Sequence, residues 1–346
     1  MMIEKAAVSP AEKLEFLANP ASWPERPASV EVIETHMSWV FLVEFSAYKL
    51  KKPVSLPFLD YSTLAARKRH CRAEVTLNRR LARDAYLGVE TLVRRPGGQL
   101  CISGRGQIVD YLIHMRRLPA DRMLDRMIAA GPPAPQTIQP AADLLARFYR
   151  HATPIHLSSG FYHERLRGDV ESNCDALLDP AYRLPAPQVE AVRRLQLAFL
   201  EQNRGLLAER SSHHIVEAHG DLRPEHICLT QPPLIIDCLE FSRDFRLLDP
   251  ADELAFLKLE CEMAGAPRVA DVFVDTYTRE LGDHPPAALF AFYQSCRACL
   301  RAKLSLWHLK DDPHQRRQDW LLKGSRYFSL ARACAGSAVT GREDVG

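Results

Sequence analysis

Apolar and polar positions divide this sequence into a strand-rich opening and a helical remainder. The run SWVFLVEFSAYKLKKPV, residues 38–54, is dense in β-branched and aromatic side chains, which favours two strands that turn near Glu44 to Ser46. Helical spacing begins at Ser62 or Thr63, either of which would serve as the N-cap, and it is expected to end before Tyr86. Two further strand patterns follow, at residues 89–93 and 108–115.

A series of amphipathic helices is predicted beyond residues 117–119. They cover residues 121–130, 138–151, 187–209, 250–264, 268–281 and 288–307. A short hairpin interrupts the series, because the apolar segments 227–229 and 234–236 flank a turn that contains Pro232 and Pro233. We interpret the proline-rich stretch GPPAPQTIQP, residues 131–140, as a linker between helices rather than a domain break.

The order of these elements predicts an α+β fold of two lobes, a small N-lobe with an antiparallel sheet and one helix and a larger, mostly helical C-lobe. The length of 346 residues agrees, because it is long for a single hydrophobic core. We expect the N-lobe to cover residues 1–117 and the C-lobe residues 118–335, with a disordered tail over residues 336–346.

Composition is that of a soluble globular protein, with 47% hydrophobic and 25% charged residues. The 45 Lys and Arg against 43 Asp and Glu leave a net charge of +2, which argues against nucleic acid or an anionic membrane as partner. The N-terminus lacks a signal-peptide pattern, and no apolar run reaches the roughly 18 residues of a membrane span. The nine cysteines are scattered, so we expect a cytoplasmic enzyme with reduced thiols, and we interpret the one C-x-x-C, Cys296 to Cys299, as helix packing rather than a zinc or redox site.

The chemistry-bearing residues concentrate in HGDLRPEHICLTQPPLIIDCLEF, residues 219–241. Its predicted hairpin places Asp221 and Asp237 at the two sides of the open end, with His219 and His226 nearby. Two carboxylates brought together in this way suit proton abstraction and the binding of a hard divalent cation. The alternative is that both are capping or turn aspartates, which the spacing and the flanking strands disfavour.

His219-Gly220-Asp221-Leu222, followed later by Ile236-Asp237, resembles the catalytic segment of the aminoglycoside phosphotransferase and choline kinase group, whose members have a protein-kinase-like fold. The resemblance implies that Asp221 accepts the proton of a substrate hydroxyl and that Asp237 holds Mg²⁺ on the phosphates of ATP. Where that family places a metal-binding Asn, this sequence has His226, a poorer partner for Mg²⁺, with Mn²⁺ as the alternative ion. Whether His226 binds metal or only forms hydrogen bonds is left open.

A kinase also needs a cation on the nucleotide phosphates, usually a strand Lys supported by a helical Glu. Lys49 and Lys51 share one face of their predicted strand, while Tyr48 and Leu50 share the other. Lys49 follows Ala-Tyr as the family's strand Lys follows its small and apolar pair, so we favour Lys49 over Lys51 as the phosphate ligand. The competing interpretation is that both are exposed lysines of an edge strand.

Glu74 is the candidate for the helical carboxylate that supports this lysine. Leu77 and Leu81 follow it at helical spacing, which puts Glu74 on an apolar face, where a buried carboxylate needs a partner. Lys49 is the obvious partner. A surface Glu74 that pairs with Arg67 or Arg79 is the alternative.

Several further segments bear on the nucleotide site. Neither G-x-G-x-x-G nor a P-loop motif occurs, and THMSW, residues 35–39, stands where a glycine loop is expected. Together with AYKLKKP, LNRRLARDAYLGV and MRRLPADRMLD, this stretch resembles a subgroup of bacterial phosphotransferase-like proteins that are often fused to a P-loop ATPase domain, which we expect to be absent here. The resemblance implies an interlobe hinge from Met115 to Leu118 that binds adenine, and a plain strand edge is the alternative.

Two acidic positions complete the candidates. Asp249 and Asp252, in LLDPADELAFL, resemble the family's brace of the catalytic loop, and Asp249 before Pro250 is a good N-cap, so a structural role is expected. Glu240 is interpreted as facing solvent rather than binding metal.

These observations favour an ATP-dependent phosphotransferase that acts on a hydroxyl of a small molecule, whose pocket residues 158–173 could line. The alternatives are a degenerate kinase fold that binds nucleotide without turnover and a nucleotidyl transferase. Neither the acceptor nor a protein partner nor the oligomeric state is evident from the sequence.

Overall fold

The computed structural model describes residues 8–56, 58–311 and 316–340. The chain forms two compact units. Unit 1 comprises Met1–Met123 and His226–Asp244, and unit 2 comprises Leu124–Glu225 and Phe245–Gly346. A six-stranded antiparallel sheet dominates unit 1 and helices dominate unit 2, which confirms the predicted α+β fold.

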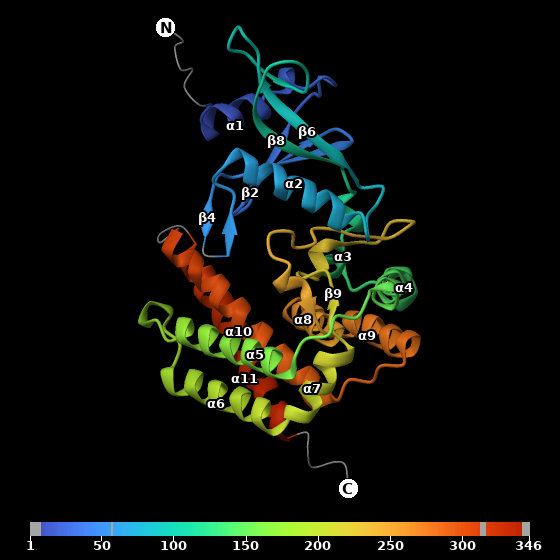
Figure 1. The fold of residues 1–346 in the computed structure, drawn as a ribbon, viewed down its shortest axis with the longest axis vertical. Coiled ribbons are helices and arrows are strands. Elements are labelled where there is room, and N and C mark those ends of the chain that lie inside the picture. Colours follow the sequence, from blue (N-terminus) through green and yellow to red (C-terminus); the bar gives the residue numbers. More distant parts are fainter. Residues whose placement is uncertain (1–7, 57, 312–315, 341–346) are drawn as a thin grey trace. The chain divides into compact units, whose positions relative to one another are not determined.

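The sheet of unit 1 has the strand order β1-β2-β3-β8-β6-β7 (Figure 1). The strands are β1 (Glu31–Glu34), β2 (Ser38–Val43), β3 (Ser46–Lys51), β6 (Tyr86–Arg94), β7 (Leu100–Ile102) and β8 (Gln107–Arg116). A short ribbon of β4 (Ser55–Leu56) and β5 (Leu59–Asp60) lies outside it. The predicted hairpin is confirmed as β2 and β3, and the turn between them places Glu44 in the left-handed backbone region at φ 45°.

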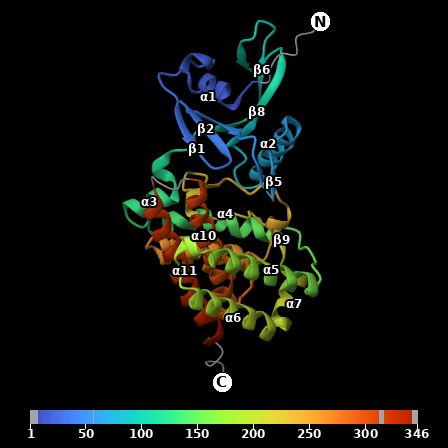
Figure 2. The same ribbon diagram turned by 90° about the vertical axis from the view of Figure 1, so that its left-hand side faces the viewer.

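One face of the sheet carries a hydrophobic core, because side chains alternate along each strand. Tyr48 and Leu50 of β3 pack there with Trp23, Phe41 and Leu17, the last from helix α1 (Pro10–Ala18). The lysines of β3 alternate with Tyr48 and Leu50 and therefore belong to the opposite face. Helix α2 (Leu64–Asn78), whose N-cap is Thr63, lies alongside the sheet (Figure 2). Its Cys71 and Val75 form a second cluster with Ala82, Ala85, Tyr86, Tyr111 and Ile113.

The predicted central hairpin is present as β10 (Ile227–Cys228) and β11 (Leu234–Ile235). It belongs to unit 1, although we expected it within a C-lobe that begins at residue 118. The physical reason lies in its contacts: the amide of Leu229 donates to the carbonyl of Arg122, and Leu234 and Ile236 pack against the Tyr86 cluster. The observed boundary falls after Met123, and residues 226–244 return to unit 1.

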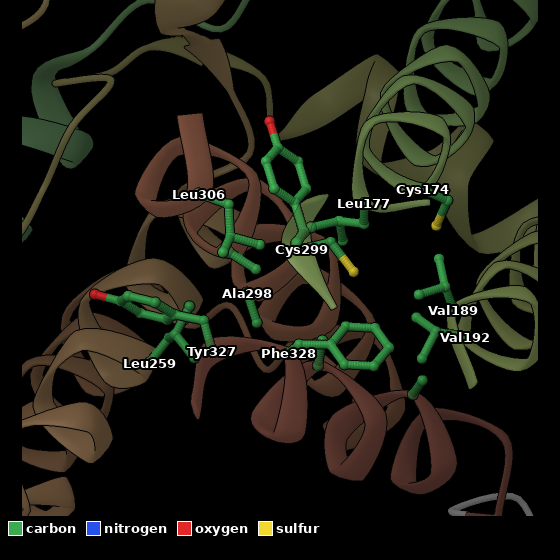
Figure 3. Close-up of a cluster of buried hydrophobic side chains, with 14 of the residues drawn as sticks. Cys174, Leu177, Val189, Val192, Leu259, Ala298, Cys299, Leu306, Tyr327 and Phe328 are labelled. Atoms are coloured by element: carbon green, nitrogen blue, oxygen red, sulfur yellow. The ribbon is translucent and has the colours of Figure 1, made fainter. Parts of the chain in front are cut away.

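Unit 2 is built from helices packed around two hydrophobic clusters. Its helices are α3 (Leu124–Ala130), α4 (Pro135–His151), α5 (Ser159–Leu177), α6 (Ala186–Gln202), α7 (Arg204–His213), α8 (Pro250–Met263), α9 (Pro267–Leu281), α10 (Ala287–Asp311) and α11 (Arg317–Thr340), with one pair of short strands, β9 (Val216–Glu217) and β12 (Leu247–Leu248). Figure 3 shows one cluster, to which Leu306 of α10, Phe328 of α11 and Val189 of α6 belong. Cys299 belongs to the same cluster and Cys296 packs against the other, as expected for helix packing.

Two predictions about the helices of unit 2 need correction, and the helices α5 and α11 were not predicted. The supposed linker over residues 131–140 is half helical, because α4 begins at Pro135 and includes Pro140. Burial of Ile138, Ala141 and Leu145 on the face of α4 outweighs the cost of a proline inside a helix, about 3 kcal/mol. The helix expected over 187–209 is two helices that meet at Asn203.

Helix α11 also includes the first part of the predicted tail, residues 336–340, whereas residues 341–346 lie outside the described residues. In the described part of the chain, every helix is too short or too polar to cross a membrane.

Candidate functional site

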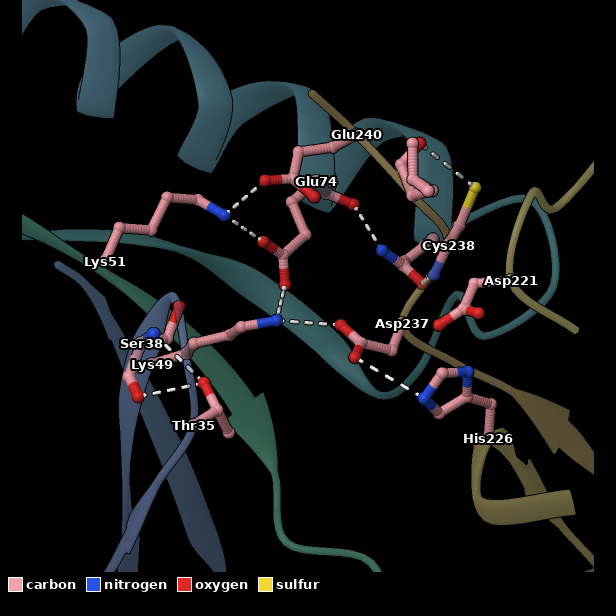
Figure 4. Close-up of polar contacts among 12 residues, drawn as sticks. Thr35, Ser38, Lys49, Lys51, Glu74, Asp221, His226, Asp237, Cys238 and Glu240 are labelled. Atoms are coloured by element: carbon pink, nitrogen blue, oxygen red, sulfur yellow. Dashed lines mark hydrogen bonds and ion pairs between the residues drawn. The ribbon is translucent and has the colours of Figure 1, made fainter. Parts of the chain in front are cut away.

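The two lysines of β3 bind the same carboxylate (Figure 4). Nζ of Lys49 lies 2.9 Å from Oε1 of Glu74, and Nζ of Lys51 lies 2.5 Å from Oε2. Glu74 is fully buried on α2, so both of its oxygens are neutralised by lysines rather than by water. The expected contact between Lys49 and Glu74 is therefore present, and Lys51 shares it.

The alternative partners of Glu74 are occupied elsewhere. Arg67 donates to Asp110 and to the carbonyls of residues 61 and 62, and Arg79 donates to the carbonyls of Tyr86 and Leu87. The helical carboxylate thus faces the lysines of the sheet and not the arginines of its own helix.

Glu240 is bound into the same cluster from the opposite side. Nζ of Lys51 lies 2.5 Å from Oε1 of Glu240, and the hydroxyl of Tyr61 donates to the same oxygen. The side chain of Glu240 is only 7% exposed. Our interpretation of Glu240 as a solvent-facing residue is wrong, because this carboxylate and Lys51 neutralise each other in a buried position.

Asp237 follows β11 in a backbone conformation that L-residues rarely adopt, with φ 61°. Two side chains of unit 1 hold the backbone there: the amide of Asp237 donates to the hydroxyl of Tyr86 at 3.2 Å, and the amide of Cys238 donates to Oδ1 of Asn78 at 2.8 Å. Strain of this kind persists only where surrounding contacts fix it, and it concentrates at functional sites.

The Asp237 carboxylate has a cationic partner on one oxygen and an imidazole near the other. Nζ of Lys49 lies 2.7 Å from Oδ1, and Nε2 of His226 lies 3.6 Å from Oδ2 (Figure 4). The amide of Ile236 donates to the carbonyl of His226 at 2.8 Å, which fixes the spacing of the two backbones. Unlike the other two carboxylates of the cluster, that of Asp237 is 43% exposed.

Mutual neutralisation governs the pKa values in this cluster. Burial by itself would lower the pKa of Lys49, but the carboxylates of Asp237 and Glu74 outweigh it and hold this pKa well above its usual value. The pKa of Lys51 is raised in the same way, by Glu240 and Glu74. Burial would conversely raise the pKa of Asp237, and Lys49 and His226 reverse that effect and lower it. Lys49, Lys51 and Asp237 are therefore charged at neutral pH.

The donor set of Asp237 and His226 fits a divalent cation. Two ligands of one ion, each at about 2.1 Å from it, lie roughly 3–4 Å apart, and the observed 3.6 Å falls in that range. Within the described ranges, no cluster of three or more His, Cys, Asp or Glu side chains could hold a metal. An ion here would take its remaining ligands from water and from nucleotide phosphates, as Mg²⁺ commonly does.

The predicted catalytic base lies in unit 2, on the loop after β9. Oδ2 of Asp221 accepts a hydrogen bond of 2.9 Å from Nη2 of Arg223, whose other terminal nitrogen pairs with Glu225. The amide of Asp221 lies 3.3 Å from Nδ1 of the buried His219. The Asp221 side chain is 29% exposed, so a solute can reach it.

Glu253 of α8 holds the backbone of this loop. Its carboxylate accepts hydrogen bonds from the amide of His219 at 3.1 Å, the amide of Gly220 at 2.5 Å and the hydroxyl of Tyr149 at 2.6 Å. The sequence pattern favoured Asp249 or Asp252 for this brace, and Glu253, the next residue along the same helix, takes that role instead.

Asp249 and Asp252 have structural partners. Asp249 is the N-cap of α8, as expected, and it also accepts two hydrogen bonds from Arg210 and one from Tyr293. Asp252 accepts two hydrogen bonds from Arg297. These contacts fix the start of α8 against its neighbouring helices, which agrees with the structural role expected for both residues.

The remaining candidates lie on separate elements. Met115 is near the end of β8, opposite Ala47 and Tyr86, and Leu118 follows that strand. Both pack against the Tyr86 cluster, so their proposed role in adenine binding has a rigid support but stays a prediction. Residues 158–173, suggested for the acceptor pocket, form most of α5.

Sequence reasoning missed the joint action of Lys51, Glu240 and Tyr61, and the role of Glu253. Some signals were present. Lys51 lies two residues from Lys49 on the same strand face, and Glu240 lies three residues after Asp237. Glu253 has the residue type of a brace, but a charged residue in the first turn of α8 is equally explained by the helix dipole.

The sequence and the fold of this chain can be compared with those of known proteins. No protein-family model matches the sequence. Uncharacterized proteins of Mycobacterium tuberculosis and Mycobacterium bovis are 31% identical over 286 residues, which cover 80% of this chain. The chain spans only 54% of the length of these relatives.

Solved structures share the fold at low sequence identity. A choline/ethanolamine kinase family protein from Mesorhizobium loti has a TM-score of 0.52 and 15% identity, with 93% of this chain and 98% of that chain covered. A GDP complex of an aminoglycoside phosphotransferase has a TM-score of 0.51 and 14% identity over 91% and 94%, and a glucosamine kinase a TM-score of 0.50 and 12% identity over 95% and 81%. The chain has the two-lobed, protein-kinase-like fold of these structures.

Proposed function

We propose that this protein is an ATP-dependent phosphotransferase that moves the γ-phosphate to a hydroxyl of a small molecule. The observation that supports it best is the arrangement of Lys49, Glu74 and Asp237, which come from a strand, a helix and the segment after a hairpin. Phosphoryl transfer from a nucleotide uses a strand lysine that is paired with a helical glutamate, together with an aspartate that can hold a divalent ion.

Within unit 1, Lys49 would bind nucleotide phosphate, and Asp237 with His226 would hold a divalent ion on it. A bound divalent cation would neutralise the charge that develops on the transferred phosphoryl group. Lys49 and Asp237 neutralise each other, so nucleotide binding would replace that one contact by two others. The ammonium of Lys49 would contact phosphate oxygens, and the carboxylate of Asp237 would hold the cation. Glu74 keeps the lysine directed during this exchange, because it is buried and cannot follow the ligand.

Within unit 2, Asp221 accepts the proton of the acceptor hydroxyl while the acceptor oxygen attacks the γ-phosphorus, and ADP leaves as the bond between the γ-phosphorus and the β-phosphate oxygen breaks. A hydrogen bond from Arg223 to Oδ2 orients the Asp221 carboxylate. Glu253 fixes the loop backbone from the buried side, so that Asp221 is held at a set position. Met115 and Leu118 supply the adenine contacts in this proposal.

One observation favours a second candidate, a kinase fold that binds nucleotide without turnover. Nε2 of His226 lies 3.6 Å from the carboxylate of Asp237, and an imidazole held beside this carboxylate would hinder a metal from using the same oxygen. Such a protein would bind nucleotide through Lys49 with little dependence on the cation.

The test is calorimetric titration of the wild type with ATP in the presence of Mg²⁺ and then of Mn²⁺, with GTP as a second nucleotide because one related fold was solved with GDP. We expect cation-dependent binding that Asp237→Ala abolishes. The control Asp84→Ala removes an exposed carboxylate of the same unit and leaves binding unchanged.

Acceptor hydroxyls are then screened by the mass of the product, with Asp221→Asn as the inactive control. Added phosphate supports the proposal, and an added nucleotidyl group would replace it. Binding without any cation dependence would favour the second candidate, and absence of binding with either nucleotide and either metal would refute both.

A further inference from the structure

Lys51 has a position that the proposed chemistry leaves unexplained. Its side chain is 1% exposed, yet it carries a full positive charge beside Glu74 and Glu240 (Figure 4). The hydroxyl of Tyr61 is its third partner. A buried ammonium is costly unless all of its neighbours compensate it, and an apolar side chain at this position would cost less. The three partners come from α2, from the segment after β11 and from the chain before α2.

The two lysines of β3 differ in how strongly they are held. Both carboxylate partners of Lys51 are buried, Glu74 at 0% and Glu240 at 7% exposure, and Tyr61 donates a hydrogen bond to Glu240. Lys49 shares Glu74, but its other partner is the 43% exposed carboxylate of Asp237. A solute can therefore separate Lys49 from Asp237, whereas nothing that stays outside the protein reaches the contacts of Lys51.

Glu240 is three residues from Asp237, and its contact with Lys51 ties this segment to β3. At the same time Lys51 holds Oε2 of Glu74, which leaves Oε1 directed at Lys49. Lys51 thus fixes both the supporting glutamate and the segment that carries the candidate metal ligand. Its contacts do not depend on whether Lys49 is paired with Asp237.

We propose that Lys51, with Glu240 and Tyr61, is a positioning clamp that keeps Glu74 and the Asp237 segment in place while Lys49 exchanges Asp237 for nucleotide phosphate. This inference rests on the proposed function of the same site. It assigns the two lysines different tasks: Lys49 contacts the ligand, and Lys51 acts only through other residues. The clamp should therefore matter most for the part of nucleotide affinity that depends on the cation.

The experiment measures ATP affinity with and without Mn²⁺ at 10 °C, together with the melting temperature, for Lys51→Met and Glu240→Gln. We expect each variant to lower the ratio of the ATP affinity with Mn²⁺ to the ATP affinity without it by about tenfold, because a buried partner of the clamp is lost. Cation-independent affinity should stay within about threefold of the wild type, since Lys49 remains on Glu74. The matched control Lys52→Met removes a neighbouring lysine that pairs with Glu34, outside the clamp, and should leave the ratio unchanged.

A merely structural Lys51 would lower the melting temperature and leave the ratio of affinities as in the wild type, and that result overturns the inference while the proposed function stands. If Lys51→Met does not fold, Glu240→Gln and Tyr61→Phe decide, because each weakens the clamp and leaves Lys51 paired with Glu74. The double variant Lys51→Met, Glu240→Gln should cost less than the sum of the two single changes, since both remove the same contact. A wild type that binds no nucleotide with either metal overturns the proposed function, and the clamp with it.

Discussion

Replacing Glu253 by Gln tests how much the hydrogen bonds of this carboxylate stabilise the loop that carries Asp221. The change keeps the shape of the side chain but converts one of two acceptor oxygens into an NH₂ donor. Oε2 of Glu253 accepts from His219 and Tyr149, and Oε1 accepts from Gly220. In the more favourable orientation of the Gln side chain, its oxygen keeps the hydrogen bonds from His219 and Tyr149. Its NH₂ group then faces the N–H of Gly220, so that two donors oppose each other.

The expected loss of folding stability follows from these three hydrogen bonds. A buried amide that loses its acceptor costs about 1–3 kcal/mol, and two bonds to a neutral rather than a charged acceptor lose about 1 kcal/mol each. Burial raises the pKa of Glu253 despite its hydrogen bonds, so removing the charge returns part of this loss. We expect a net destabilisation of unit 2 by about 2–4 kcal/mol, or a melting temperature lower by about 5–15 °C for a unit of about 200 residues.

Thermal unfolding followed by circular dichroism checks the stability, and calorimetry checks ATP binding. Glu262→Gln is the matched control, because it makes the same change on the same helix at a partly exposed residue with one long hydrogen bond of 3.4 Å to Gln294, and should shift stability by less than about 0.5 kcal/mol. Glu253→Gln should keep cation-dependent ATP affinity and lower phosphoryl transfer. A variant as stable as the wild type would show that the loop does not need this carboxylate.

Three further predictions concern catalysis, pH and packing. Asp221→Asn should abolish transfer at unchanged ATP affinity, measured by product mass and calorimetry, and a loss of ATP affinity would contradict the separation of roles. Burial by itself would raise the pKa of Glu240, but Lys51 and Lys49 outweigh it and lower this pKa. The ionised Glu240 therefore stabilises the fold above about pH 4.3, the usual pKa of Glu, and this stabilisation is lost as the pH falls through the lowered pKa. The melting temperature of Glu240→Gln should depend less on pH below about 4 than that of the wild type, and an unchanged dependence would refute this. Gly324→Ala places a Cβ 2.6 Å from Cγ of the buried Leu306 and should destabilise by about 1–2 kcal/mol, whereas Gly336→Ala on the same helix meets no atom within 4 Å and should stabilise by up to about 1 kcal/mol; equal melting temperatures would contradict the packing of α10 and α11.

Local patterns in the sequence predicted most of the elements that carry the site. The hairpin of β2 and β3 and the N-cap Thr63 of α2 follow from β-branched runs and a hydroxyl before helical spacing. Strand β1 was missed because all four of its residues are exposed, so that it shows no alternation. Helix α1 was also missed, although Ser9, Pro10 and Glu12 form a capping box with proline at the first position.

Partners in the site could be predicted only where a known motif supplied them. The pair of Lys49 and Glu74 was expected because both residue types occur in the order that the kinase resemblance requires. The contact of Lys51 with Glu240 joins residues 189 positions apart, and residue type alone does not choose among so many acids. The same limit applies to Glu253, whose carboxylate reaches the backbone of a loop more than thirty residues earlier in the chain.

The division of unit 1 into two stretches of sequence has a consequence for biosynthesis. When Met1–Met123 has left the ribosome, Lys49 and Lys51 have only Glu74 between them, because Asp237 and Glu240 belong to the later stretch His226–Asp244. Two ammonium groups facing one carboxylate cannot be buried without a large desolvation cost. The nascent sheet therefore keeps this face hydrated until about 120 more residues have been translated, at roughly 5–20 residues per second. A fragment that ends at Met123 would hold the same incomplete charge set permanently.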